Sequence, residues 1–403
     1  FEKTGVNYRK VGRVDDGTSG NWGGLAVSGM WTHHQKSIIV DAPVPGAPDR
    51  RRLICFVGGL DITDGRWDTP EHSLFRTLGT YHKPPDFHQA CWVTTPEYGP
   101  REPWHDIHMK AEGAVSYDVL KNFEDRWKKQ VTDEEGKNKL YKLPSEFLSP
   151  DEEAGRYMNY DEFVCQFFRS IDERSAVFDH GMPGVFAKKG RAVEASIHDA
   201  YCHQIRRAEK FLYIENQYFL GSSHAWVKHA DDFALHIIPL EITQKIINKI
   251  NRDERFSAYI LIPMHPEGIP GDRAVQEILY WQYQTVRMMY KMIGDAIKRK
   301  GIKAHPRDYL SFYCVGKREV PDGGLPLTDM PPKPGSDSDK LLKSRRCMIY
   351  VHSKMMIVDD EYIIIGSANI NDRSMAGTRD TEMAIGCFQP YYTVEYNQGK
   401  LPQ

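Results

Sequence analysis

The sequence predicts an α/β fold of two similar lobes, each a mostly parallel or mixed β-sheet flanked by helices. The first observation behind this prediction is that short β-branched runs alternate with longer segments of helical period. The second is an extended pattern that occurs twice, once near each end of the chain. The third is size and composition, because 403 residues, 40% hydrophobic and 27% charged, suffice for two or three packed domains.

Each element follows from a local pattern. Strands are predicted where β-branched or aromatic residues form short runs between turns, at residues 37–40, 53–57, 211–214, 258–262 and 312–315. Helices are predicted where apolar residues recur every three or four positions, at residues 114–130, 195–210, 239–251 and 272–300. Segments rich in Gly, Pro, Asp or Ser predict a loop over 15–20, within the polar stretch 1–30, a surface turn over 43–50 and a mobile loop over 320–340.

Charge and cysteine content narrow the classes of function. Lys and Arg number 53 and Asp and Glu 55, so the formal charge of −2 gives no global attraction to nucleic acid, and no such partner is expected. No apolar run approaches the roughly 20 residues of a membrane-spanning helix. The seven cysteines contain no Cys-x-x-Cys pair, which argues against a zinc ribbon, and their odd number and scattered positions favour a reducing, cytoplasmic location. Because no signal peptide is visible and Phe1 opens the chain, we expect a piece of a longer protein.

The repeated pattern carries the chemistry. Its copies are His-Gln-Lys at residues 34–36 and His-Ser-Lys at residues 352–354, each followed by four mostly apolar residues and an aspartate. Downstream, residues 56–64 align with residues 364–372, because each stretch continues as Gly-Gly or Gly-Ser, then Asp or Asn, Ile and Asp. A single His-x-Lys is usually a surface feature, whereas two extended copies predict a functional pair.

The spacing within each copy suits phosphodiester chemistry. Residues two apart on a strand project to the same side, so histidine and lysine share a face. Two copies that meet across a pseudo-twofold axis would place two imidazoles and two ammonium groups in one site between the lobes. The lysines can hold the non-bridging oxygens of a phosphodiester. One neutral imidazole can attack phosphorus, while the other, protonated, donates to the leaving oxygen. This scheme needs no metal at the phosphorus.

The motifs are similar to the HKD signature of the phospholipase D superfamily, and the surrounding residues resemble its plant, C2-domain type. The resemblance covers the chain from about residue 29 to residue 390. Its most specific stretches are residues 32–36, 56–61, 64–70, 100–108, 213–219 and 352–375.

The resemblance implies roles for the motif residues. In each half-site the histidine is a nucleophile or an acid/base, the lysine binds phosphate and the aspartate is a support. The half-sites are His34, Lys36 and Asp41 in one case, and His352, Lys354 and Asp359 in the other. Which histidine is the nucleophile stays open.

Three further residues are candidates for substrate contact beside the two histidines. Gln217 lies at a predicted strand end, and Ser367 and Asn369 follow the second motif. A structural role is an equally open interpretation for Gln217, whose amide can hold a loop in place.

His72 and His105 match positions that the resemblance associates with a calcium site near the catalytic pocket, so Ca²⁺ is the expected cofactor. Imidazole is an unusual ligand for this hard cation. The chemistry of the two side chains alone equally permits hydrogen bonds to a phosphate or a lipid headgroup. The aromatic residues of the 272–300 helix are expected to lie in the core, with an acyl-chain surface as the alternative.

The expected domains are a first HKD lobe at 1–130, a connecting region at 131–192 and a second HKD lobe at 193–403. The family's N-terminal C2 domain has no counterpart here, and no helix–strand unit is recognisable before the first motif. Beyond residue 390 the sequence departs from the family's closing segment. We therefore expect both lobes to be incomplete.

The function that the resemblance implies is phospholipase D activity. Such an enzyme hydrolyses phosphatidylcholine and related glycerophospholipids to phosphatidic acid and free headgroup through a phosphohistidine, and transfers the phosphatidyl group to primary alcohols. It would act as a cytoplasmic protein peripherally bound to a phospholipid membrane. Two alternatives stay open: another HKD phosphodiesterase, and an inactive fragment or pseudoenzyme that only binds lipid.

Overall fold

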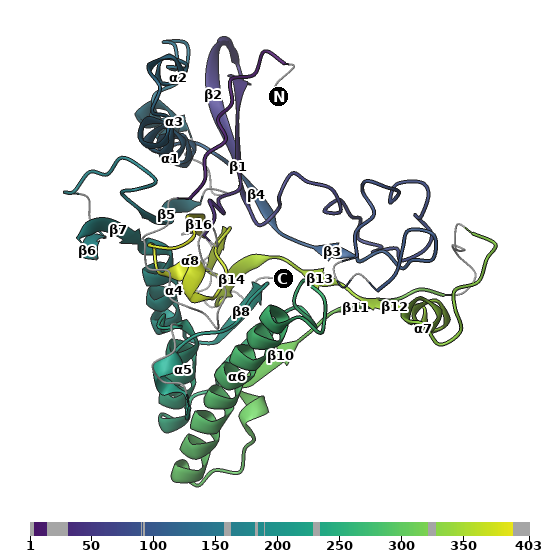
Figure 1. The fold of residues 1–403 in the computed structure, drawn as a ribbon. Coiled ribbons are helices and arrows are strands. Elements are labelled where there is room, and N and C mark those ends of the chain that lie inside the picture. Colours follow the sequence, from purple (N-terminus) through teal and green to yellow (C-terminus); the bar gives the residue numbers. More distant parts are fainter. Residues whose placement is uncertain are drawn as a thin grey trace.

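The computed structural model describes residues 4–13, 31–89, 91, 93–156, 163–181, 184–188, 190–228, 234–320 and 328–389. The loop predicted over 15–20 falls outside these ranges, as does the segment beyond residue 390. Within the described residues, two main sheets form, one of nine strands and one of three (Figure 1).

The nine-stranded sheet is mixed. Its strands follow the order β10 (Leu310–Tyr313), β9 (Ser257–Leu261), β8 (Phe211–Asn216), β14 (Lys354–Val358), β15 (Tyr362–Gly366), β16 (Glu382–Phe388), β5 (Val164–Asp172), β7 (Arg191–Ala195) and β6 (Val185–Lys188). Only β10, β9 and β8 pair in parallel, and the other neighbours are antiparallel. β14, which begins with the second-motif lysine, is hydrogen-bonded on both sides, so the sheet fixes its backbone.

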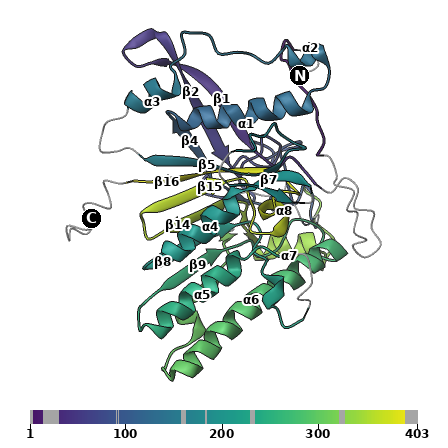
Figure 2. The same cartoon turned by 90° about the vertical axis from the view of Figure 1, so that its left-hand side faces the viewer.

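Three helices pack against this sheet and enclose the main core. They are α4 (Ser196–Arg207), α5 (Ile238–Asn251) and α6 (Arg273–Lys300), which Figure 2 shows side by side. Their apolar faces bury isoleucines and methionines against strand residues such as Leu212, Ile214 and Ile260. The predictions of these helices from apolar spacing are confirmed to within a few residues.

The three-stranded sheet has the order β1 (Ser37–Val44), β2 (Ala47–Gly58) and β4 (His108–Glu112), all antiparallel. The strands β1 and β2 reach further than expected. The surface turn predicted over 43–50 was therefore too long, because only residues 45–46 form the turn and the flanking residues pair as strand. Helix α1 (Val115–Gln130) packs with β2 and β16 around Val57, Val119 and Ile385, which joins the two sheets.

The remaining elements are short. Strands β3 (Trp104–His105) and β13 (Tyr350–Val351) pair in parallel, and β11 (Gly316–Arg318) pairs with β12 (Arg346–Met348). The short helices are α2 (Glu134–Lys137), α3 (Pro150–Arg156), α7 (Asp337–Ser344), α8 (Asp372–Met375), η1 (Ser223–Ala225) and η2 (Pro306–Asp308). α7 lies partly within the mobile loop predicted over 320–340, because Ser336 caps its first turn by accepting from the Asp339 backbone N–H.

The α/β prediction is confirmed, and the two motif copies open strands of different sheets, consistent with two lobes. The predicted connecting region contributes β5, β6 and the start of β7 to the nine-stranded sheet, and the lobe boundaries stay a prediction. In the part of the chain that the structure describes, no helix is long and apolar enough to cross a membrane.

Candidate active site

The second motif is positioned by strand pairing. β13 lies parallel to β3, and the His352 backbone N–H donates to the His105 carbonyl at 2.7 Å. Lys354, two residues on, begins β14. The strand that positions this segment is therefore β3, and Asp106, which directly follows β3, lies 246 residues before His352 in the sequence.

His352 is held by a buried carboxylate. Its Nδ1 lies 2.8 Å from Asp106 Oδ2, its ring lies 4.8 Å from the Trp104 ring, and its side chain is only 6% exposed. Burial, and then the positive charge of Lys354, lower the pKa of His352 to about 4 despite the Asp106 carboxylate. The imidazole is therefore neutral at pH 7, with Nδ1 engaged and Nε2 left for a substrate.

His34 of the first motif has a matching support. Its Nδ1 lies 3.0 Å from both carboxylate oxygens of Glu382, the first residue of β16. Burial alone would raise the pKa of Glu382, but the His34 charge and hydrogen bonds from His34, Ser367 and Ser374 lower it. Glu382 thus stays ionised, and the His34 side chain, at 24% exposure, is the more accessible of the two imidazoles.

The two motif lysines make equivalent contacts. Lys36 Nζ donates to the His34 carbonyl at 2.9 Å, and Lys354 Nζ donates to the His352 carbonyl. Lys36 also pairs with Asp61 at 3.2 Å, and Lys354 donates to Gln217 Oε1 at 2.9 Å. Burial first, and then the charge of Lys36, lower the pKa of Lys354 to about 7. Two cations thus share one small region, an arrangement that favours a bound anion.

Both histidines line one cavity of about 470 Å³. Gln217 and Asn369, two of the predicted substrate-contact residues, also line it, as does Asp61. Gln217 is tied into the site, because Nε2 donates to Tyr350 Oη at 2.9 Å while Oε1 accepts from Lys354 and Asn369. Gln217 can therefore belong to the site and also hold neighbouring residues in place.

Part of the cavity lining is apolar. It is formed by Leu220, Trp226, Ile278 and Trp281, with the two indole rings stacked at 5.4 Å between centroids. Ile278 and Trp281 belong to the 272–300 helix, whose aromatic residues were expected mainly in the core. Trp281 and Tyr290 do pack against the main core, whereas Tyr280 and Tyr283 are exposed, and the first turns of this helix, α6, also line this cavity.

Seven predicted site residues are not among those that line this cavity: Lys36, Lys354, His72, His105, Ser367, Asp41 and Asp359. Ser367 is fully buried and donates to Glu382 Oε2 at 2.5 Å, so it positions the carboxylate, and direct substrate contact does not fit its burial. Asp41 pairs with Arg51 on the neighbouring strand, and its side chain is 53% exposed. Asp359 accepts the backbone N–H groups of Lys210 and Phe211 at 2.8 Å each. Both aspartates therefore have the contacts of structural supports, and contact with a reacting group does not fit them.

The histidines predicted to bind calcium form contacts with carboxylates. His72 Nδ1 lies 2.9 Å from Asp68 Oδ2, and His105 Nε2 lies 2.8 Å from Glu215 Oε2. The hydrogen bond to Glu215 raises the pKa of His105. Although the two rings are neighbours, at 6.4 Å between centroids, no group of three or more His, Cys, Asp or Glu side chains suited to a metal occurs among the described residues. Two imidazoles already paired with carboxylates do not fit a cation that prefers six to eight oxygen ligands.

Asp106 and Glu382 were not predicted as partners of the histidines. Asp106 lies within the specific stretch 100–108, and Glu382 follows the second motif, but no fixed spacing links either carboxylate to its histidine. The one sequence feature that could have indicated these two carboxylates is an acidic residue at the end of a predicted buried strand.

Comparison with known proteins defines the family. The phospholipase D family model matches residues 1–403. This chain belongs to the phospholipase D family.

Among curated relatives, the chain is 48% identical to phospholipase D alpha 1 of Nicotiana tabacum and 47% identical to phospholipase D alpha 2 of Arabidopsis thaliana. Each alignment covers 97% of this chain and 50% of the relative, so the chain spans about half the length of these proteins. A solved phosphatidylserine synthase from Haemophilus influenzae matches 74% of this chain and 55% of its own at 12% identity, but its TM-score of 0.35 is too low to support an argument.

Proposed function

We propose that this chain has phospholipase D activity. It would hydrolyse phosphatidylcholine and related glycerophospholipids to phosphatidic acid and free headgroup. The observation that carries this proposal is the placement of His34 and His352 in one cavity, each held at Nδ1 by a buried carboxylate. The names of the relatives point to the same activity.

The proposed first step forms a phosphohistidine. Lys36 and Lys354 bind the non-bridging oxygens and offset the charge that develops at phosphorus. His352 Nε2 attacks phosphorus, the bond from phosphorus to the headgroup oxygen breaks, and protonated His34 donates its Nε2 proton to that oxygen.

The second step regenerates the enzyme. Neutral His34 takes a proton from water, whose oxygen attacks phosphorus while the bond from phosphorus to His352 Nε2 breaks. Phosphatidic acid is released. A primary alcohol in place of water would give transphosphatidylation by the same bond changes.

His352 is assigned as the nucleophile because of its environment. A nucleophilic imidazole must be neutral, and burial together with Lys354 keeps the pKa of His352 at about 4. His34 is four times as exposed, which suits a group that exchanges protons with the headgroup and with water.

Calcium takes no part in these steps. The family resemblance associates Ca²⁺ with the positions of His72 and His105, but among the described residues the side chains do not form a calcium donor set. We propose that the core reaction depends on the two histidines and two lysines, and that any Ca²⁺ requirement acts outside this cavity.

Peripheral association with a cytoplasmic membrane surface is supported by the apolar rim, which we define as Leu60, Ile62, Val227, Leu235 and Ile269. All five side chains are exposed, Ile62 at 84%, and each lies within two residues of a cavity-lining residue. Ile62→Asn should reduce co-sedimentation with phosphatidylcholine vesicles, whereas Tyr141→Ser, a change at an exposed site remote from the cavity, should not.

All seven cysteines are free thiols, which suits a reducing compartment.

The activity is tested with phosphatidylcholine and ethanol, using the 403-residue chain and its His352→Asn variant. Phosphatidylethanol from the unsubstituted chain alone would support the proposal. No product from either, with a cooperative melt that shows folded protein, would favour an inactive lipid-binding chain. Hydrolysis of a nucleic-acid phosphodiester but not of the phospholipid would favour another HKD phosphodiesterase.

A further inference from the structure

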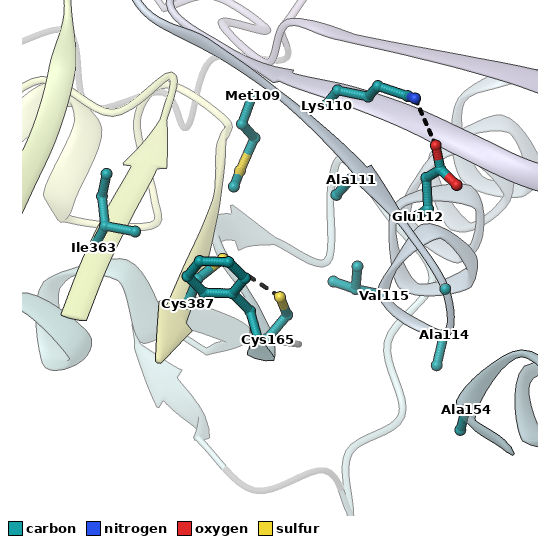
Figure 3. Close-up of a pocket in the computed structure, with 12 residues that line it drawn as sticks. Met109, Lys110, Ala111, Glu112, Ala114, Val115, Ala154, Cys165, Ile363 and Cys387 are labelled. Atoms are coloured by element: carbon teal, nitrogen blue, oxygen red, sulfur yellow. Dashed lines mark hydrogen bonds and ion pairs between the residues drawn. The ribbon is translucent and has the colours of Figure 1, made fainter. Parts of the chain in front are cut away.

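A second cavity lies away from the catalytic site, between the two sheets (Figure 3). Its volume is about 500 Å³, and it shares no lining residue with the catalytic cavity. Met109 and Ala111 of β4 form one side, and Ile363 of β15 contributes to the other. Two cysteines, Cys165 and Cys387, also line it, although the proposed reaction uses neither.

The two thiols face each other across an antiparallel strand pair. Cys165 on β5 and Cys387 on β16 are register partners, and their Sγ atoms are 3.4 Å apart. Figure 3 shows both side chains directed toward the same point at the cavity. The pair therefore joins positions 222 residues apart in the sequence.

The backbone already has the geometry of a cross-link. Directly opposed residues of an antiparallel pair have Cα atoms about 4.5–5.5 Å apart. Disulfides span Cα separations of about 4.4–6.8 Å. Closing the bond requires the sulfur atoms to approach by rotation of the side chains, with no change of register.

Access and reactivity differ between the two thiols. Cys165 is partly exposed, whereas Cys387 is buried. The hydrogen bond between them lowers the pKa of the Cys165 thiol and raises that of Cys387. Cys165 is therefore the better nucleophile, and Cys387 is placed to resolve its oxidised form.

We propose that Cys165 and Cys387 are an oxidisable dithiol that closes to a disulfide on reaction with a peroxide. The Cys165 thiolate attacks one oxygen of hydrogen peroxide, which breaks the O–O bond and gives the sulfenic acid and, after protonation, water. Cys387 sulfur then attacks the sulfenic sulfur, the S–O bond breaks, and the thiol proton leaves with the hydroxyl as a second water. Each chain thus reduces one peroxide as its two thiols become one disulfide.

The cross-link would fasten β16 to β5. The ladder between them runs from Glu382 opposite Ser170 to Phe388 opposite Val164, so it includes the strand that carries the partner of His34. Because the bond would close a very long loop of the unfolded chain, we expect the oxidised form to melt about 2–5 °C higher than the reduced form.

The test uses the full 403-residue chain, treated with hydrogen peroxide, alkylated and digested without reduction. We expect a peptide cross-linked between Cys165 and Cys387, the loss of two free thiols, and reversal of both by dithiothreitol. Cys165→Ser and Cys387→Ser should each abolish the cross-link and the rise in melting temperature. Cys314→Ser, which removes an exposed cysteine elsewhere, should leave both intact.

Two results would overturn the proposal. One is a cross-link from Cys165 to Cys55, a buried neighbour that accepts from the Ser116 hydroxyl at 3.6 Å. The other is oxidation of Cys165 to sulfinic acid with Cys387 unchanged. Because the peptide map is made on the unsubstituted chain, both results can be recognised even if a serine variant fails to fold.

Discussion

His34 Nδ1 lies 3.0 Å from both carboxylate oxygens of Glu382, a residue 348 positions away in the sequence. Glu382 is fully buried and receives further hydrogen bonds from Ser367 and Ser374. This contact fixes the orientation of the His34 ring and leaves its Nε2 for the proposed proton transfer.

Glu382→Gln should therefore impair turnover without unfolding the chain. An amide keeps the shape of the side chain but loses the charge, so we expect turnover to fall about 10²–10⁴-fold. Steady-state assays with phosphatidylcholine would measure the loss. Glu135→Gln, at a carboxylate that is 80% exposed, is the matched control and should retain full activity. Equal activity of the two variants would remove Glu382 from the mechanism.

Lys354 predicts a pH dependence of substrate capture. Its pKa of about 7 means that the ammonium is present below pH 7 and is lost as the pH rises above it. Because an anionic phosphodiester needs this charge, kcat/KM should fall as the pH increases from 7 to 9. Lys354→Arg keeps a positive charge over this range and should weaken the fall. The same basic limb in both proteins would contradict this role for Lys354.

Gly59 should tolerate no side chain. A Cβ there would come within 2.3 Å of Asp106 Oδ1 and 2.9 Å of the His352 carbonyl, so Gly59→Ala must displace the Asp106–His352 pair. We expect a destabilisation of about 1–3 kcal/mol and at least a tenfold loss of turnover. In Gly155→Ala a Cβ meets nothing within 4 Å, so that variant should behave like the unsubstituted chain. Urea unfolding and turnover of both variants would decide the point.

Two buried histidines predict how stability depends on acid. The pKa of His352 and that of His236 are each lowered to about 4, mainly by burial. Between pH 4 and about 6.5 the unfolded chain binds protons that the folded chain does not, so the free energy of unfolding should rise with pH in this window. The expected gain is about 3 kcal/mol per histidine at most.

Urea unfolding at pH 4.5 and pH 7 would measure this dependence. His352→Asn should reduce the difference between the two pH values. His224→Asn, at an exposed histidine, should leave it unchanged. A larger or unaltered difference in His352→Asn would show that the imidazole is not buried in its neutral form.

Local pattern was enough to predict the elements with strong periodicity. Helix α6 was predicted at 272–300 and observed at Arg273–Lys300, since its apolar residues repeat over many turns. The repeated His-x-Lys pattern likewise brought His34 and His352 to one cavity, because equivalent motifs occupy equivalent strand positions.

Long-range pairing could not be predicted in the same way. The strands β5 and β16 are assembled by register between residues more than 200 positions apart, and β5 lay in the predicted connecting region. A bridge between His33 and Thr381 places Glu382 at His34, while β3 and β13 bring Asp106 to His352. Because tertiary contacts bring each carboxylate to its histidine, no fixed spacing in the sequence indicates the partners of His34 and His352, and both were found only in the structure.

The central claim is that His352 becomes covalently phosphorylated while His34 serves the leaving group. It is tested most directly with a phospholipid whose headgroup is p-nitrophenol, a leaving group that needs little protonation, followed by rapid quenching and peptide mapping. We predict that His34→Asn accumulates the phosphatidyl group on His352, and that His352→Asn forms no adduct. An adduct on His34 in the His352→Asn variant, with none on His352 in the other, would contradict the assignment.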